Sequence, residues 1–196
     1  MRRCGTLLSV MAALALAATW DTRPALPRRF GVVEAGELYR SGEISPRQLA
    51  HLARERGVRT VISLLDPSAP VSQRERAAAE RLGLRWVNIP LRGDGSSTAG
   101  DRARILEALE RADNGPTLVH CAAGSNRTGL AIGLHRIVRR GWTVERAMEE
   151  LRSYDFEDLP KHQNLRDALR EAALRGGAVV EAGGRVATPT SGDAGG

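Results

Sequence analysis

Hydrophobic residues along the middle of the chain fall into two alternating kinds of segment. Short runs rich in branched apolar residues, at Val58–Leu65, Leu84–Leu91 and Thr117–Val119, are typical of buried strands. Between and after them lie longer stretches in which apolar residues recur every three or four positions, as in amphipathic helices. This alternation predicts an α/β fold, with a mainly parallel central sheet flanked by helices on both faces.

Local signals place the ends of these elements. Val32–Val33 and Leu38–Tyr39 predict a hairpin that turns at Gly36. Capping residues, prolines and glycines delimit the helices. The predicted helices span Pro46–Arg56, Ser72–Leu82, Asp101–Ala112, Arg127–Arg140 and Lys161–Leu174. A further helix, capped by Thr143 and including Leu151, is predicted between the last two.

The N-terminus has a different pattern from the rest of the chain. Arg2 and Arg3 precede an almost uninterrupted apolar run, Thr6–Ala18, which ends near the small residues of Ala15–Ala17. The run is shorter than the roughly 20 residues that span a membrane. We therefore interpret residues 1–20 as a cleaved signal peptide, with an uncleaved N-terminal membrane anchor as the alternative. Either reading predicts an exported protein, periplasmic or anchored to the membrane.

Composition limits the remaining possibilities. The chain of 196 residues fits one domain with tails. Its net charge is +6, and arginine supplies almost all of its positive charge. No basic stripe with interleaved aromatic residues is present, so nucleic acid is not an expected partner. We predict a linker at residues 21–29, one folded domain at 30–176 and a Gly/Ala-rich disordered tail at 177–196.

The segment His120–Gly129 carries the clearest chemistry. A β-prone run delivers Cys121 to a glycine-containing loop, and an apolar helical stretch follows. Backbone N–H groups of Ala122, Ala123, Gly124, Ser125 and Asn126, together with the helix N-terminus, can bind an anion there. The same positive field favours the thiolate form of a cysteine. Arg127 can hold two phosphate oxygens with its planar guanidinium.

These residues match the signature H-C-x5-R-[S/T]-G at every defined position. The chain thereby resembles the protein tyrosine phosphatase superfamily, in its small dual-specificity-like branch. The resemblance implies that Cys121 is the nucleophile and Arg127 the phosphate clamp. It further implies that Thr128 stabilises the thiolate as a leaving group. It also implies that His120, behind the cysteine, adjusts the reactivity of that cysteine and does not act as a base. The implied reaction needs no metal and no organic cofactor.

Two other readings of the same segment fail on the residues. A nucleotide-binding P-loop requires a lysine where Leu130 stands. A zinc site requires several Cys and His ligands at short spacing, and only His120 accompanies Cys121.

A phosphatase of this kind also needs a general acid, which the resembled superfamily carries as an aspartate upstream of the cysteine. Asp94, between two glycines in the segment Leu91–Ser96, is our candidate. Asp101 is the rival, although its place at a helix start suits a cap or a first-turn acid. Gln163 could position water, but the simpler interpretation is that His162 and Gln163 form a polar pair at a helix start. Arg40 borders the pocket or has a structural role.

We therefore expect a phosphomonoester hydrolase that acts on phosphotyrosine, phosphoserine or phosphothreonine in proteins. A phosphatase of inositol phosphates or phosphoinositides is the alternative, although relatives of that kind often carry lysines inside the loop. Here Ala122, Ala123 and Ser125 occupy those positions. A phosphate-binding pseudophosphatase is the third reading, and it applies if Asp94 is misplaced.

Overall fold

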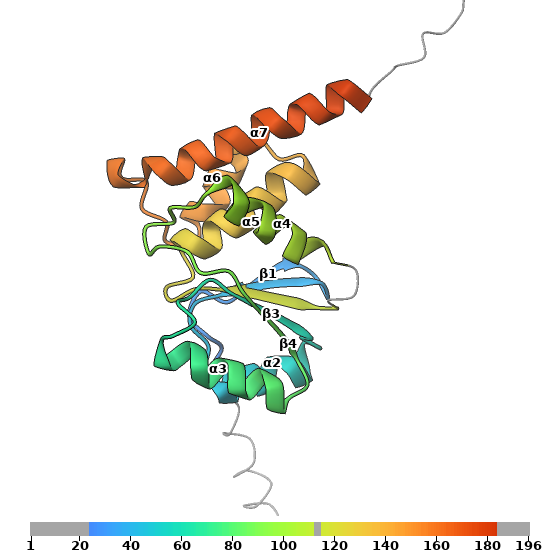
Figure 1. Ribbon diagram of the computed structural model, residues 1–196, viewed down its shortest axis with the longest axis vertical. Helices are drawn as coiled ribbons and strands as arrows, with labels where there is room; N and C mark the ends of the chain where they lie inside the picture. The colour runs from blue at the N-terminus through green and yellow to red at the C-terminus, as the bar shows by residue number, and fades with distance from the viewer. Residues whose placement is uncertain (1–23, 112–114, 184–196) are drawn as a thin grey trace, which may run out of the picture. The chain divides into compact units, whose positions relative to one another are not determined.

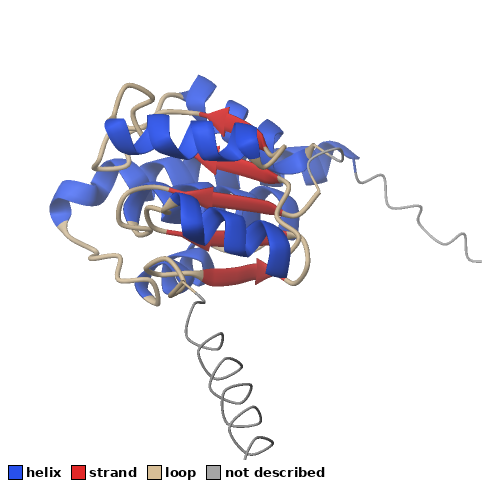
Figure 2. Ribbon diagram, turned by 90° about the horizontal axis from the view of Figure 1, so that it is seen from below, coloured by secondary structure: helices blue, strands red, loops and turns tan. Residues whose placement is uncertain are grey.

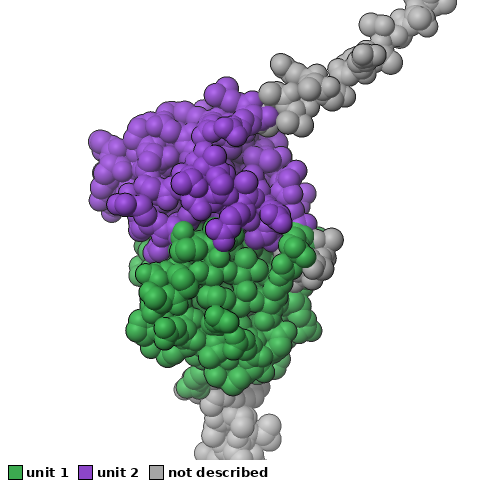
Figure 3. Space-filling model, in the orientation of Figure 1, with its two compact units in different colours: residues 1–90, 111–124 green, residues 91–110, 125–196 purple. Residues whose placement is uncertain are grey.

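The computed structural model describes residues 24–111 and 115–183. They fall into two compact units, coloured separately in Figure 3. The first unit comprises residues 1–90 and 111–124, and the second comprises residues 91–110 and 125–196.

The first unit contains a sheet of five strands in the order β1-β2-β5-β3-β4. β1 and β2 form an antiparallel hairpin, and every other pairing is parallel. The predicted mainly parallel sheet is thus confirmed, and β5 is its central strand. Figures 1 and 2 show the sheet from two sides. The strands are β1 (Gly31–Glu34), β2 (Leu38–Ser41), β3 (Thr60–Ser63), β4 (Arg85–Asn88) and β5 (Thr117–His120).

Two helices, α2 (Pro46–Glu55) and α3 (Pro70–Arg81), cover one face of this sheet (Figure 1). Side chains alternate between the two faces of a strand, so Tyr39, Val61 and Leu118, which are paired in register, share a face. They pack into one apolar cluster with residues of both helices. The cluster consists of Tyr39, Ile44, Leu49, Leu52, Val58, Val61, Ala78, Ala79, Leu84 and Leu118.

The ends of these elements follow from local chemistry. Gly36 turns the hairpin with a φ of 75°, which a glycine adopts without strain. Ser45 caps α2 in a reciprocal arrangement with Gln48, and Pro46 occupies the first turn. Gly57 follows the helix with a φ of 67°. The hairpin and this helix were both predicted from the sequence, and both are confirmed.

The second unit is helical. Its elements are α4 (Ala99–Glu110), α5 (Asn126–Arg140), α6 (Val144–Arg152), the 3-10 turn η2 (Pro160–His162) and α7 (Gln163–Gly183). α5 is its most buried helix, and glycines on α5 allow its neighbours to approach closely. A Cβ at Gly129 would lie 2.9 Å from Leu151 Cγ of α6, and one at Gly133 would lie 2.9 Å from Leu169 Cδ2 of α7.

Some predicted boundaries were wrong. α3 starts at Pro70 rather than Ser72, because Pro70 suits the first turn of a helix. The backbone of α7 continues to Gly183, into the segment predicted to be a disordered tail from 177. Extending an existing helix adds one hydrogen bond for each residue fixed, so a low-complexity sequence can continue it. The rest of the predicted tail lies outside the described residues.

The predicted leader at residues 1–20 also lies outside the described residues, so the signal peptide and the anchor both stay predictions. Within residues 24–111 and 115–183, no helix combines the length and apolar composition needed to cross a membrane.

The close approach of α5 and α6 yields a prediction about stability. Gly129→Ala places a methyl group against Leu151, so we expect the free energy of unfolding to fall by about 1–3 kcal/mol. Urea denaturation followed by circular dichroism measures this change. Gly93→Ala is the matched control, since a Cβ there meets no atom within 4 Å. Equal stability of the two variants would contradict the close packing.

Candidate active site

The segment His120–Gly129 begins in the first unit and continues in the second, because the division between the units follows Gly124. Its two parts are therefore described separately, each with the contacts of its own unit.

In the first unit, β5 delivers Cys121 directly from the carboxyl end of the central strand. The cysteine is buried, with 2% of its surface exposed. The backbone N–H of Gly124 donates a hydrogen bond to Cys121 Sγ at 3.2 Å. A donor aimed at the sulfur stabilises negative charge on it, as a nucleophilic thiolate requires.

The turn after Cys121 depends on glycine. Gly124 has a φ of 79°, in the left-handed region. A Cβ there would also lie 2.6 Å from the backbone nitrogen of Gly42. In turn, a Cβ at Gly42 would lie 3.0 Å from the carbonyl oxygens of both Ala122 and Ala123. The segment that follows β2 thus packs backbone to backbone against the loop, and neither glycine has room for a side chain.

The carbonyl groups of the loop are bound by that neighbouring part of the chain. The Glu43 N–H donates to Ala122 O at 3.0 Å. Arg29 Nη1 donates to Ala123 O at 2.8 Å, and buried Arg40 donates through Nη2 to Gly124 O at 2.9 Å. In a trans peptide the N–H points away from the preceding C=O. Binding these carbonyls therefore turns the N–H groups that follow them toward the opposite side, as an anion cradle requires.

His120, the last residue of β5, directly precedes the cysteine and is fully buried. Its Nε2 is 2.9 Å from Glu75 Oε2 on α3. Glu75 was not identified from the sequence. A signal was nevertheless present, because Ser72, Glu75, Ala78 and Ala79 form the buried face of α3 and the charged residue stands at a core position.

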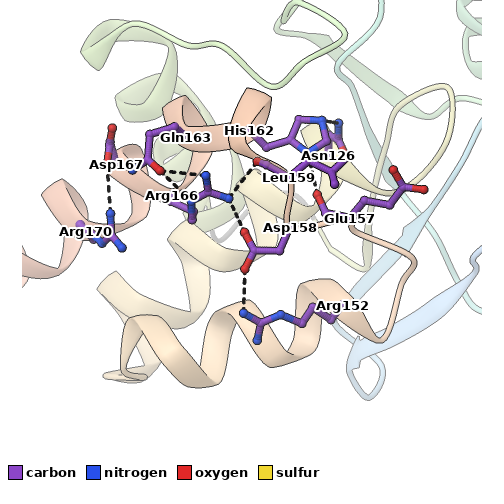
Figure 4. Close-up of polar contacts among 10 residues, drawn as sticks. All are labelled: Asn126, Arg152, Glu157, Asp158, Leu159, His162, Gln163, Arg166, Asp167 and Arg170. Carbon is purple, nitrogen blue, oxygen red and sulfur yellow. Dashed lines mark hydrogen bonds and ion pairs between the residues drawn. The ribbon is translucent and has the colours of Figure 1, made fainter.

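In the second unit, the continuation of the loop is held by the connection between α6 and α7 (Figure 4). Ser125 Oγ donates to the Asp155 carbonyl at 3.0 Å. His162 Nδ1 lies 2.6 Å from the Glu157 carbonyl, which can only accept, so Nδ1 carries the proton. In the neutral ring Nε2 is then an acceptor, and Asn126 Nδ2 lies 3.4 Å from it. His162 is thus a buried support of the loop.

The same connection is anchored by a second set of contacts, drawn in Figure 4. Asp158 accepts from Arg152 Nη2 at 2.9 Å and also pairs with Arg166. The Arg152 hydrogen bond, with that of Arg166, holds the pKa of Asp158 below its ordinary value. Gln163 is exposed and bonds to Arg166 and Asp167, on the same helix. In the structure these contacts give Gln163 the role of a polar residue at a helix start.

Arg127 and Thr128 lie in the first turn of α5. The Arg127 side chain is half-buried, and its Nη1 lies 3.4 Å from the carbonyl oxygen of Leu91. Leu91 opens the segment that carries Asp94, so the predicted clamp and the predicted acid segment are neighbours. Gly95 packs in the same region, where a Cβ would lie 3.9 Å from Asn126 Cβ and 3.2 Å from Leu165 Cδ1.

Asp94 itself is exposed, in a tight turn. The Gly95 N–H closes the turn onto Arg92 O at 2.9 Å, and the Ser96 N–H donates to Asp94 Oδ1 at 2.9 Å. The Ser96 backbone N–H and then the Ser96 hydroxyl hold the pKa of Asp94 below its ordinary value. In this conformation the ionised form of the Asp94 carboxyl is favoured.

Asp101, the rival acid, lies in the first turn of α4. Thr98 N and Thr98 Oγ1 donate to Asp101 Oδ2 at 2.9 and 2.7 Å, and the Asp101 N–H returns a bond to Thr98 Oγ1 at 3.1 Å. This reciprocal arrangement caps the helix. It confirms the interpretation of Asp101 as a first-turn acid. Among the residues that the structure describes, no three His, Cys, Asp or Glu side chains gather as a metal site would require.

Comparison with known proteins decides which family contains this arrangement. A model of the tyrosine phosphatase family matches residues 25–166. The chain belongs to this family. The curated relatives include the dual specificity protein phosphatase TpbA of Pseudomonas aeruginosa, 34% identical over 143 residues, and inositol diphosphatase DSP3 of Arabidopsis thaliana, 30% identical over 127 residues. The alignments cover 72% and 63% of this chain, and 60% and 61% of those relatives.

Solved structures of tyrosine phosphatases and related enzymes have the same fold. The structure of P. aeruginosa TpbA superposes with a TM-score of 0.62 at 25% identity, covering 80% of this chain and 98% of that one. The core catalytic domain of the PP-IP phosphatase SIW14 from S. cerevisiae superposes with a TM-score of 0.63 at 22% identity. That match covers 78% of this chain and 95% of SIW14.

Within this member of the tyrosine phosphatase family, the lowered pKa of Asp94 has a measurable consequence. We expect the Asp94 carboxyl, followed by NMR, to titrate below the ordinary aspartate value. Ser96→Ala should raise this midpoint only in part, since the backbone N–H remains. A folded-state pKa that is lowered contributes stability above the unfolded pKa, and this is lost as pH falls through the folded value. Thr98→Ala, which alters the cap at Asp101, should leave Asp94 unchanged. An ordinary or raised titration midpoint for Asp94 would contradict the hydrogen bonds that Ser96 makes to it in this turn.

Proposed function

We propose that this chain is a cysteine-dependent phosphomonoester hydrolase that acts on phosphorylated proteins through a phosphocysteine intermediate. The observation that carries the proposal is the buried Cys121 sulfur, which accepts an N–H from Gly124 within a complete H-C-x5-R-T-G motif. Membership of the tyrosine phosphatase family supports the same reaction.

The first chemical step forms a sulfur–phosphorus bond. The thiolate of Cys121 attacks the phosphorus atom, and the bond from phosphorus to the ester oxygen breaks. Loop N–H groups stabilise the charge on the non-bridging oxygens, and Arg127 supplies two further donors from its planar group. The leaving oxygen takes a proton from a general acid, for which Asp94 is our candidate.

In the second step, water attacks the phosphorus atom of the phosphocysteine. The carboxylate that lost its proton in the first step accepts a proton from this water, and inorganic phosphate and the thiolate are released. Thr128, whose side chain is fully buried at the start of α5, is our candidate for stabilising the departing thiolate.

Two observations favour proteins as the substrate class. A relative that is 34% identical is a dual specificity protein phosphatase, and a solved TpbA structure contains pTyr. Moreover, the loop positions occupied by Ala122, Ala123 and Ser125 carry no cationic side chain for the further phosphates of a polyphosphate.

Inositol phosphates are the second candidate class, because DSP3 is an inositol diphosphatase and SIW14 a PP-IP phosphatase. A panel that contains phosphotyrosine, phosphoserine and phosphothreonine peptides and inositol pyrophosphates separates the two classes. We expect the highest kcat/KM on a phosphopeptide. A higher kcat/KM on inositol pyrophosphate would show that inositol phosphates, rather than proteins, are the substrate class. The proposed phosphocysteine chemistry would be unchanged.

The nucleophile can be tested directly. Cys121→Ser replaces the thiolate by a hydroxyl that stays protonated, so hydrolysis of an aryl phosphate should be abolished. Calorimetry should still detect binding of inorganic phosphate, because the loop N–H groups remain. The matched control is Cys4→Ser, which should keep full activity. Hydrolysis that survives Cys121→Ser would overturn the mechanism, and binding without turnover in the unmodified chain would identify a pseudophosphatase.

The proposed acid predicts a dependence on the leaving group. Asp94→Asn should lower kcat by roughly 10²–10⁴-fold on alkyl phosphates, whose leaving oxygen needs a proton. The loss should shrink on p-nitrophenyl phosphate, because a stable leaving anion needs little protonation. Asp101→Asn is the control and should give no such dependence. Equal losses of kcat on both substrates would show that Asp94 only stabilises its turn and does not act as the acid.

A further inference from the structure

A cavity of about 330 Å³ lies among three helices of the second unit. Residues of α4, α5 and α7 line it, and the unit that contains them is coloured purple in Figure 3. Val138, on its wall, lies beyond Arg127 on α5 by roughly 16 Å along the helix axis. The cavity is therefore separate from the phosphate-binding loop, and no step of the proposed reaction uses it.

The walls of this cavity are mainly apolar. Leu106 of α4 and Leu134 and Val138 of α5 supply large hydrocarbon side chains. Ala103 of α4 and Ala172 of α7 also line the cavity, and each carries only a methyl group, which leaves space between the helices. Cavities of about 300–1,000 Å³ with mainly apolar walls and a few polar groups are typical of small-molecule sites. The volume, at the lower end of that range, indicates a small ligand that is largely hydrocarbon.

The charged groups that line the cavity carry an excess of positive charge. They are Arg102, Arg139, Arg175 and Glu171. Glu171 pairs with two of the arginines at once, through Oε2 with Arg102 Nη2 at 2.5 Å and through Oε1 with Arg175 Nη2 at 2.7 Å. One carboxylate balances only one guanidinium, so this group of three has a net positive charge. Arg139 pairs with Glu110, which does not line the cavity.

Two arginines of this group differ in how firmly they are held. The Arg102 side chain is only 15% exposed, and its Nη1 donates to Ser97 O at 3.0 Å. The Arg175 side chain is 73% exposed and is therefore able to move. A guanidinium binds a carboxylate through two parallel hydrogen bonds, and partial burial reduces the screening of its charge. A fixed arginine beside an apolar wall and a mobile one at the surface suit the anionic end of a ligand.

We propose that this cavity binds a medium-chain fatty acid, with its hydrocarbon chain against the apolar walls and its carboxylate against Arg102 and Arg175. Apolar walls offer no partners for the hydroxyl groups of a sugar, and the excess of arginine disfavours an organic cation. A hydrocarbon chain that ends in a carboxylate matches both parts of the cavity. This site goes beyond the proposed phosphatase function and does not depend on it.

Calorimetry on the full chain tests the ligand class, with hexanoate, octanoate and decanoate as probes. We expect saturable binding of decanoate, and an affinity that rises by up to about fourfold for each methylene group added. Octylamine and 1-octanol have the chain length of octanoate but no negative charge, so each should bind at least about tenfold more weakly than octanoate. Absence of decanoate binding, or equal binding of octylamine and octanoate, would overturn the proposal.

A pair of neighbouring alanines on α7 tests the place of binding. Ala172 and Ala173 are both half-buried, but only Ala172 lines the cavity. Ala172→Phe places a ring in the space, so it should abolish decanoate binding, and Ala173→Phe is the matched control that should retain it. Circular dichroism checks that both variants fold. If Ala172→Phe does not fold, Ala103→Phe at an exposed position of the opposite wall replaces it. Binding that survives in a folded variant with a filled cavity would refute this site.

A pair of exposed arginines on α7 tests the carboxylate contact. Arg175→Gln should weaken decanoate binding by about two- to fivefold, since the lost ion pair is partly screened by water. Arg170→Gln is the control, because Arg170 is also exposed, pairs with Asp167 at 3.2 Å and does not line this cavity. Equal affinities of the two variants would contradict the contact. Size-exclusion chromatography adds a last check: a dimer that Ala172→Phe dissociates, without decanoate binding, would identify a second copy as the occupant and overturn the proposal.

Discussion

The contact of two backbone segments, at Gly42 after β2 and at Gly124 in the loop after β5, is the constraint on which the site depends. Their separation leaves no room for a Cβ on either side, and Gly124 also needs a left-handed φ. The N–H of Glu43 and the side chains of Arg29 and Arg40 then bind the outward-facing carbonyls. Peptide geometry turns the following N–H groups the other way, and the cysteine sulfur already accepts one of them.

Both units contain buried polar groups that contact other polar groups of the same unit. In the first unit, Glu75 and His120 are within ion-pair distance beneath the sheet, and Trp86 binds the remaining carboxylate oxygen. In the second unit, the buried His162 connects Asn126 to the chain between α6 and α7. Such partly charged networks are costly to leave incomplete, so they favour one arrangement of the residues that they hold.

Much of the secondary structure could be predicted, because its signals are local. The hairpin at Gly36, the capped start of α2 and the cap of α6 by Thr143 each depend on residues within one turn. The continuation of α7 could not be predicted, because helix propagation from a well-formed helix overrides a weak local preference. The turn that engages Asp94 was missed for another reason: a mobile acid and an Asx turn have the same Gly-Asp-Gly sequence.

The sequence by itself determined the motif and its spacing, which predict the nucleophile and the arginine clamp, since these are properties of adjacent residues. Only the tertiary structure decided that β5 lies between β2 and β3, and hence that Gly42, Arg40 and Glu75 are neighbours of the loop. Pairing between parallel strands joins segments distant in sequence, and neither its order nor its register is written in local periodicity. A glutamate on an amphipathic helix therefore comes within ion-pair distance of a histidine only because the sheet places β5 next to that helix.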